Sequence, residues 1–300
     1  MTRYSIPQPL KVGDKGVIVS PAGAVDGKYI DGAINVLSEW GIRMEAAPHA
    51  RGCYGRFSGT PEERLSDLQD AMDDVDNRLI FCSRGGYGAV HLLEKLNFDK
   101  LKESPKWLVG YSDITALHQL FLHHKLASLH APMAKHLTED APNAASGYLN
   151  DILFGRPLHY TLESHPLNLA GETDGALFGG NMAVFYSLLA TPCTTVPRDG
   201  ILFLEDIGER PYQIDRMLWT LKLSGIFGRI KGLLVGHFTD CAEDPLMFRS
   251  IYELIRGMVE KYNIPVAFGF PVGHTAGNYP LIHGGKVKLT VGKQQVELKF

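Results

Sequence analysis

The chain has 300 residues, of which 45% are hydrophobic and 21% are charged, and its formal net charge at pH 7 is −3. This composition is typical of a globular protein with one large or two ordinary domains and a substantial buried core. The slightly negative charge, without any long basic run, argues against nucleic acid as a partner. No apolar stretch reaches the roughly 18 residues that a membrane span needs, so no membrane partner is expected either.

The cysteines and the first residues bear on the cellular compartment. Cys53, Cys82, Cys193 and Cys241 are far apart and form no C-x-x-C pair. This dispersion favours reduced thiols over a disulfide framework. The chain begins with MTRYSIP and lacks the apolar core of a signal peptide. We therefore expect a cytoplasmic protein.

The first half of the chain alternates short apolar runs with helical periods. The apolar runs that predict buried strands cover residues 16–20, 79–82 and 107–109. A helix is predicted over residues 29–40. A second helix is predicted to begin after Thr60, because Thr60, Pro61 and Glu63 form the pattern of a capping box. The alternation of strand and helix predicts a parallel sheet with helices on its faces.

The second half begins less regularly. Residues 141–173 are rich in Pro, Asn, Ser and His and are interpreted as an inter-domain linker or an extended crossing. This interpretation gives an N-terminal domain over 1–140 and a C-terminal domain over 174–300. The elements predicted in the C-terminal domain are helices over 181–190, 214–221 and 247–261, strands over 201–204, 233–235 and 266–268, and a hairpin of 286–291 with 294–300.

Ser112 lies at the turn between the predicted strand at 107–109 and a helical period. Gly110 ends the strand, and apolar residues return at helical spacing from Ile114 onward. A hydroxyl at such a turn projects from the end of the sheet, where N–H groups of the first helical turn can stabilise an oxyanion. Ser112 is therefore a candidate nucleophile. The alternative, that Ser112 only caps the helix, stays open from this stretch alone.

A glycine-rich segment follows the predicted strand at 79–82. Residues 83–88, SRGGYG, fit neither the dinucleotide pattern G-x-G-x-x-G nor a P-loop. The segment is either a tight strand–helix turn or a functional loop whose Gly86 N–H faces the Ser112 site. Arg84 is a candidate for binding a substrate carboxylate, although a surface salt bridge is the commoner role of a single arginine.

Two further candidates stand near the ends of predicted strands. Glu205 is the first acid after the apolar run 201–204, where a carboxylate is partly desolvated and needs a partner such as an imidazolium. His274 lies on a loop after the strand at 266–268, a position that can carry a general base, although most loop histidines are bystanders. The other histidines lack the spacing of zinc ligands, so no metal site is expected.

Ser112, Glu205 and His274 support one another as a set. A serine is a poor nucleophile until an imidazole accepts its proton, and the imidazole in turn needs a carboxylate on its other nitrogen. The three residues stand on three separate segments, each near the end of a predicted strand. They are the predicted catalytic residues, and spacing alone does not show that they meet.

At these residues the chain resembles the LD-carboxypeptidase family of serine peptidases, which includes murein tetrapeptide carboxypeptidases and microcin C self-immunity proteins. The resemblance spans nearly the whole chain. It depends on motifs in the family's order: Ser20-Pro21-Ala22, Arg84-Gly85-Gly86-Tyr87-Gly88, Gly110-Tyr111-Ser112-Asp113, His130-Ala131-Pro132-Met133, Gly179-Gly180-Asn181, Leu204-Glu205-Asp206 with Tyr212 and Asp215-Arg216, and Gly273-His274. One departure is Ala131, where the family has glycine.

The resemblance implies an α/β fold with an N-terminal parallel-sheet domain like that of class I glutamine amidotransferases and a smaller C-terminal α/β domain. It also implies a homodimer that needs no cofactor. The catalytic triad maps onto Ser112, Glu205 and His274. The backbone N–H groups of an oxyanion hole map onto Gly86 and Asp113. Substrate contacts are predicted for Arg84, Gly85 and Asn181.

The implied function is hydrolysis of an amide bond between an L-centre and a D-residue, with a murein tetrapeptide that loses its terminal D-Ala as the substrate. Two alternatives stay open. An immunity-type member of the family cleaves aminoacyl-sulfamoyl adenylates and needs an aromatic contact for the base. Phe238 and Tyr279 could provide it, but no aromatic loop insertion favours this. A non-catalytic protein that binds murein peptides is disfavoured by the intact triad positions.

Overall fold

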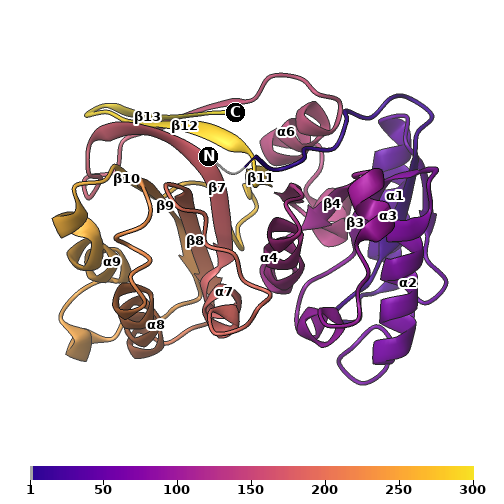
Figure 1. The fold of residues 1–300 in the computed structure, drawn as a ribbon, viewed down its shortest axis with the longest axis horizontal. Helices are drawn as coiled ribbons and strands as arrows, with labels where there is room; N and C mark the ends of the chain where they lie inside the picture. The colour runs from indigo at the N-terminus through magenta and orange to yellow at the C-terminus, as the bar shows by residue number, and fades with distance from the viewer. Residues whose placement is uncertain (1–2) are drawn as a thin grey trace.

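A computed structural model describes residues 3–300. Two sheets lie side by side, the first formed mainly by the N-terminal half of the chain and the second by the C-terminal half (Figure 1). The mixed α/β architecture confirms the predicted fold class. Among residues 3–300, no helix combines the length and the apolar character that crossing a bilayer requires.

The first sheet has six strands in the order β11-β5-β4-β3-β1-β2. They are β1 (Lys15–Val19), β2 (Arg43–Ala46), β3 (Asn77–Cys82), β4 (Trp107–Gly110), β5 (Ser128–His130) and β11 (Leu281–His283). The first five strands are mutually parallel, as predicted, and β11 pairs antiparallel with β5. Since β11 comes from the far end of the chain, the edge of the first sheet lies within the range predicted for the C-terminal domain.

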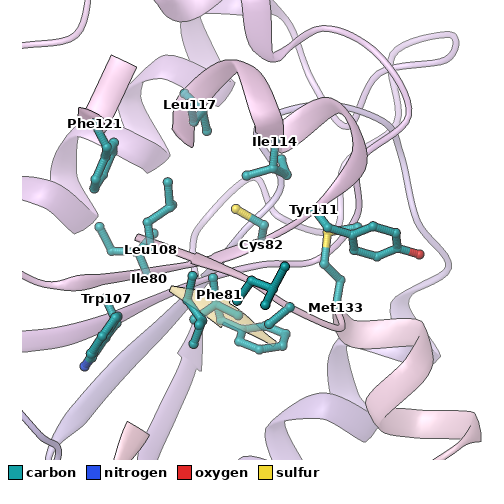
Figure 2. Close-up of a cluster of buried hydrophobic side chains, with 14 of the residues drawn as sticks. Ile80, Phe81, Cys82, Trp107, Leu108, Tyr111, Ile114, Leu117, Phe121 and Met133 are labelled. Atoms are coloured by element: carbon teal, nitrogen blue, oxygen red, sulfur yellow. The ribbon is translucent and has the colours of Figure 1, made fainter. Parts of the chain in front are cut away.

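Helices cover the first sheet. They are α1 (Gly27–Glu39), α2 (Pro61–Asp73), α3 (Asp99–Glu103), α4 (Thr115–His123) and α5 (Ala134–Glu139), with 3₁₀ turns at η1 (Ala89–Leu92) and η2 (Ser112–Ile114). The predicted capping box is confirmed, because the Thr60 hydroxyl accepts the Glu63 N–H and the Glu63 carboxylate accepts the Thr60 N–H. In Figure 2, Leu117 and Phe121 of α4 lie over Leu108 of β4.

The second sheet has seven strands in the order β10-β9-β8-β7-β12-β13-β6. They are β6 (His159–Glu163), β7 (Gly171–Asn181), β8 (Ile201–Ile207), β9 (Gly232–Thr239), β10 (Val266–Phe268), β12 (Lys286–Val291) and β13 (Gln295–Lys299). Strands β7 to β10 are parallel, whereas β12, β13 and β6 extend the sheet antiparallel from β7. The predicted C-terminal hairpin is therefore confirmed as β12 with β13.

The remaining helices are α6 (Ala144–Leu153), α7 (Met182–Leu188), α8 (Pro211–Leu223) and α9 (Ile251–Val259), with 3₁₀ turns at η3 (Pro245–Met247) and η4 (Glu260–Tyr262). The segment 141–173, interpreted as an inter-domain linker or an extended crossing, contains α6, β6 and the start of β7 and is thus more regular than its composition indicates. Strand β7 was missed because glycines and charged residues hide its alternation. The helix predicted over 247–261 is shorter in the structure. Ser250 caps the start of α9, and Asn263, in the left-handed backbone conformation, ends the 3₁₀ turn that follows it.

Three fully buried histidines lie where the two sheets meet. His118 of α4 hydrogen bonds to Ser128 Oγ and to the Gly110 carbonyl, each at 2.8 Å. His283 Nε2 of β11 accepts the N–H of Gly179 at 3.1 Å. Burial lowers the pKa of His118 to about 4, and it lowers the pKa values of His130 and His283 well below the usual value. All three are therefore neutral near pH 7.

We predict that these histidines make the folded protein less stable as the pH falls. The unfolded chain binds protons near pH 6.5, whereas the folded chain does not, so stability is lost as the pH falls below about 6.5. His118 alone should account for a loss of about 2 kcal/mol between pH 7.5 and pH 5. Urea unfolding at several pH values gives the slope of the free energy of unfolding against pH. This slope should correspond to about one proton fewer in His118→Gln than in the wild type. His123→Gln, at the exposed end of α4, is the control, and equal slopes in both variants would contradict the prediction.

Candidate active site

Ser112 occupies a strained turn directly after β4. Its φ is 63°, in the left-handed region that costs a residue with a side chain roughly 1–2 kcal/mol. Tyr111, not Ser112, is the residue before the 3₁₀ turn, and no side-chain cap is formed there. The alternative that Ser112 is only a helix cap is therefore wrong. A strained strand-to-helix turn that exposes a serine is the arrangement that presents the nucleophile in α/β-hydrolases.

Gly85 lets the neighbouring loop approach this turn. A Cβ atom on Gly85 would lie 2.9 Å from Ser112 Cβ and 3.1 Å from the Asp113 nitrogen. Real Cβ atoms essentially never approach as closely as 2.9 Å. The loop after β3 and the turn after β4 can therefore pack together only with glycine at this position.

The structure brings the three predicted catalytic residues together. His274 Nε2 lies 3.0 Å from Ser112 Oγ, and His274 Nδ1 lies 2.8 Å from Glu205 Oε2. Glu205 is fully buried, while 16% of the His274 side chain is exposed. The chain of contacts from carboxylate to imidazole to hydroxyl has the geometry in which a serine can be activated as a nucleophile.

Glu205 lies within β8 and not beyond its end as predicted, because the strand continues to Ile207. The next residue, Asp206, accepts hydrogen bonds from Asn181 Nδ2 at 2.8 Å and from the Ala183 and Ile207 N–H groups at 2.9 Å each. Burial raises the pKa of Asp206 to about 7. The Asp206 carboxylate thereby fixes the start of α7 against β8.

Asn181 is placed away from the cleft, in contrast to its predicted substrate contact. It is 5% exposed, its Oδ1 accepts the Val184 N–H as the cap of α7, and its Nδ2 donates to Asp206. Its hydrogen-bonding groups are therefore occupied in the framework of the second sheet. The glycine and asparagine motif that suggested a binding role fits a turn at the end of β7 equally well.

The two predicted oxyanion donors border the nucleophile turn. Gly86 has φ 96°, which favours glycine, and Asp113 follows Ser112 directly. Within residues 3–300, neither main-chain N–H donates to a protein acceptor. The Asp113 carboxylate accepts the N–H of Ala89 at 2.9 Å, which ties the two loops together. Both N–H groups are thus available to a ligand.

Buried Arg64 of α2 stabilises the glycine-rich loop from behind. Its Nη1 donates to the carbonyls of Pro21 at 2.7 Å and Gly88 at 2.9 Å, and its Nε donates to the Gly59 carbonyl at 3.2 Å. One side chain therefore links the loops after β1 and β3 and the start of α2. Arg64 reads as an ordinary helix residue in the sequence, and no spacing signal distinguishes it.

A cleft of about 740 Å³ lies over Ser112 and His274, whereas the buried Glu205 does not line it. Ser112, His274, Gly85 and Gly86 line it, as do the charged residues Arg84, Lys135 and Asp26. Arg84 Nη1 donates to the Ala24 carbonyl at 2.6 Å, which holds the side chain at the cleft wall. Lys135 was not predicted, although it stands two residues after the motif at 130–133 that follows β5. Among residues 3–300, no group of three or more His, Cys, Asp or Glu side chains could hold a metal ion.

Comparisons with known proteins agree with this geometry. Models of the LD-carboxypeptidase N-terminal and C-terminal domains match residues 17–131 and 174–289. The probable murein peptide carboxypeptidase of Bacillus subtilis is 30% identical over 298 residues, which cover 96% of this chain and 92% of the relative. The crystal structure of muramoyltetrapeptide carboxypeptidase from Oxalobacter formigenes, also 30% identical, covers 95% of this chain and 98% of its own with a TM-score of 0.87.

The microcin C7 self-immunity protein MccF is similar in fold. Its wild-type structure has a TM-score of 0.86 at 22% identity and covers 98% of both chains. The matches together define a carboxypeptidase, and hence a peptide hydrolase. The chain belongs to the LD-carboxypeptidase family. The likeness to class I glutamine amidotransferases and the domain limits 1–140 and 174–300 stay predictions.

We predict that Gly85→Ala lowers activity sharply while leaving the protein folded. The added methyl group must displace the Ser112 turn, and a misplacement of about 1 Å near a reacting atom can cost roughly 10²-fold in rate. Gly147→Ala in α6 is the matched control, since nothing lies within 4 Å of the added atom. Rates and melting temperatures of both variants test this. An active Gly85→Ala enzyme would show that the close approach is not needed.

Proposed function

We propose that the protein is a serine carboxypeptidase that hydrolyses an amide bond between an L-centre and a terminal D-amino acid. The substrate that we propose is a cytoplasmic murein tetrapeptide, which loses its D-Ala in cell-wall recycling. The observation that carries the proposal is the hydrogen-bonded series from Glu205 through His274 to Ser112 at the base of the cleft. The names of the relatives, a murein peptide and a muramoyltetrapeptide carboxypeptidase, support the substrate class.

In the proposed mechanism, His274 Nε2 accepts the proton of Ser112 Oγ while the oxygen attacks the carbonyl carbon of the scissile amide. Glu205 accepts the Nδ1–H of His274, which fixes the tautomer and stabilises the imidazolium that forms. The N–H groups of Gly86 and Asp113 donate to the oxyanion of the tetrahedral intermediate.

The intermediate collapses as the C–N bond breaks and His274 gives its proton to the leaving amine. Water then attacks the acyl-enzyme with His274 as the base, which releases the shortened peptide and restores the Ser112 hydroxyl. No cofactor enters these steps, since every proton moves between Ser112, His274, the substrate and water.

A carboxypeptidase must recognise a free carboxylate, and the charges of the cleft suit this task. Arg84 and Lys135 are cations at the cleft wall, whereas Asp26 is the one acid among the described lining residues. We assign carboxylate recognition to Arg84, together with the Gly85 backbone beside it. A guanidinium can bind a carboxylate through two parallel hydrogen bonds, and its remaining N–H groups are available after the bond to Ala24.

The homodimer and the cytoplasmic location belong to the same proposal. The homodimer rests on the family resemblance, and the cytoplasmic location rests on the dispersed cysteines. Light scattering during gel filtration should give twice the mass of the chain if the dimer forms. A monomeric mass at micromolar concentration would contradict it.

The first experiment is incubation of the purified protein with L-Ala-D-Glu-diamino acid-D-Ala, followed by mass spectrometry. We predict loss of one alanine, abolished in Ser112→Ala because no other group replaces the nucleophile. Ser83→Ala is the matched control, since Ser83 lines the same cleft but hydrogen bonds to Ser20. Hydrolysis by Ser112→Ala at the wild-type rate would contradict the mechanism.

Other outcomes of this experiment separate the alternatives. If the tetrapeptide is not cleaved but an aminoacyl-sulfamoyl adenylate is hydrolysed, the same triad would serve in antibiotic immunity. Binding of the tetrapeptide with no turnover of either compound would favour a non-catalytic binding protein.

We also predict that Arg84→Gln raises KM for the tetrapeptide by roughly tenfold or more, with a smaller effect on kcat. Removing the guanidinium takes away a charge-assisted hydrogen bond to the substrate carboxylate, and such bonds contribute about 1.5–3 kcal/mol. Arg56→Gln is the control, because Arg56 is exposed on the neighbouring loop and does not line the cleft. An unchanged KM in Arg84→Gln would assign carboxylate recognition elsewhere.

A further inference from the structure

Behind the triad, several fully enclosed polar atoms have no hydrogen-bond partner among residues 3–300. They are Glu205 Oε1, Asn278 Nδ2, Thr275 Oγ1 and both ring nitrogens of His130. Glu205, Asn278 and His130 are each fully buried. An unpaired buried polar group costs about 1–3 kcal/mol, and more when it is charged, so native proteins rarely leave one unsatisfied.

Two of these side chains meet at Gly273, the residue before His274. Asn278 Oδ1 accepts the N–H of Gly273 at 2.9 Å. A Cβ atom on Gly273 would lie 2.7 Å from Glu205 Oε2, so the Glu205 carboxylate lies against the same glycine. The bond to Gly273 also fixes the orientation of the Asn278 amide. Its two N–H donors therefore point away from Gly273, and they have no acceptor at hydrogen-bond distance in the part of the chain that the structure describes.

Thr275 belongs to the same short turn. Its N–H donates to the Gly273 carbonyl at 2.9 Å, and its own carbonyl accepts the Asn278 N–H at 3.2 Å. The Thr275 hydroxyl is enclosed and can both donate and accept a hydrogen bond. The turn that carries His274 thus also carries two enclosed donor groups, those of Thr275 and Asn278, that have no partner among residues 3–300.

His130 of β5 approaches this turn from the first sheet, where its side chain interacts with that of Asn278. Its ring lies 5.7 Å from the ring of Tyr111 and 5.1 Å from that of Phe203. Burial, with smaller effects from nearby histidines that include His274, lowers the pKa of His130 well below its usual value, and hydrogen bonding by the Asn278 side chain, longer than an ordinary hydrogen bond, acts in the opposite direction. The neutral imidazole offers one N–H donor and one acceptor nitrogen, and neither has a partner at ordinary hydrogen-bond distance among the described residues.

Glu205 Oε1 needs a hydrogen-bond donor, whereas the Asn278 amide needs an acceptor. A small molecule that both donates and accepts hydrogen bonds can satisfy both groups. A buried water typically makes about three hydrogen bonds to polar groups that lack other partners. We infer that His130, Thr275 and Asn278 bind one or more ordered water molecules that donate the missing hydrogen bond to Glu205 Oε1. The three side chains are then positioning residues of the triad, which act on His274 through Glu205. This inference rests on the triad assigned above.

Such a water stabilises the Glu205 carboxylate where bulk solvent does not reach it. A donor to one carboxylate oxygen withdraws charge from the other, which holds the imidazolium of His274. The other titratable groups that face this pair are Tyr111 after β4, Asp206 of β8 and His136 of α5. None of the hydrogen bonds found for these three groups reaches Glu205 Oε1, since that atom is unpartnered.

The direct test is a high-resolution crystal structure of the resting protein, which does not depend on the identity of the substrate. We expect a water within hydrogen-bond distance of Glu205 Oε1 and of at least one of His130, Thr275 and Asn278. We expect that water to be lost or displaced in Asn278→Ala. A wild-type structure in which Glu205 Oε1 has no solvent neighbour would overturn the inference, whatever the substrate proves to be.

The positioning role is tested by the pH dependence of kcat/KM for the tetrapeptide. Without the water, the carboxylate holds the His274 proton more tightly, so the acid limb should move to higher pH by roughly one unit in Asn278→Ala. Thr275→Val, which keeps the side-chain shape, should shift it in the same direction.

Asn77→Ala provides the matched control for this pH experiment. Asn77 is fully buried at the start of β3, and its Nδ2 donates to the Ala71 carbonyl at 2.9 Å. Its loss should lower stability without moving the limb. If Asn278→Ala and Thr275→Val leave the limb at its wild-type pH, the water has no role in positioning the triad.

Discussion

The contact between Glu205 and His274 is the constraint on which the rest of the site depends. It places an ionisable pair in a region where the carboxylate has no contact with solvent. A charge in such a place must be hydrogen bonded, and breaking a buried pair by removing one partner typically costs about 3–5 kcal/mol. The pair also belongs entirely to the second sheet and its loops, whereas Ser112 belongs to the first. The triad therefore exists only while the two sheets keep their relative position.

Direct hydrogen bonds across the junction maintain that position. Thr115, three residues after the nucleophile, accepts the N–H of Asn181 at 3.0 Å, and the absence of a side chain at Gly180 lets these segments meet. Strand β11 returns to the first sheet from the C-terminal region and carries His283, which accepts the N–H of Gly179 on β7. Helices α4 and α7 face each other along the same junction (Figure 1). Alignment of nucleophile and base is thus a consequence of packing between sheets.

How much the sequence predicts depends on whether a feature is local. Strands β1, β3 and β4, the capping box at Thr60 and the final hairpin follow from residues within a few positions of one another, and they were predicted close to their observed bounds. The candidate set Ser112, Glu205 and His274 could be proposed from strand ends and family motifs. Their meeting could not, because residues 112 and 274 are joined only through contacts between the two sheets.

The features that sequence reasoning missed have physical reasons of their own. Strand β7 mixes glycines with charged residues in its first half, so its pairing with β12 and β8 is decided by neighbouring strands and not by its own propensity. Asn181 was expected at the substrate, yet a buried Asp206 on the next strand uses its amide. Lys135 reaches the cleft only because α5 packs beside α1, where Tyr29 donates to Glu139 at 2.6 Å.

The places where local rules fail are also the places where the proposed chemistry is located. Ser112 adopts a backbone conformation that its side chain disfavours, and Glu205 is one of two adjacent buried acids in a strand whose other residues are apolar. Each departure is stable only because distant residues compensate for it. Gly85 leaves room for the turn, and His274 pairs with one carboxylate oxygen. The second oxygen of Glu205 has no donor among residues 3–300, so by the same argument a compensating group belongs beside it. The enclosed donors of Asn278, Thr275 and His130 define where that group is to be found.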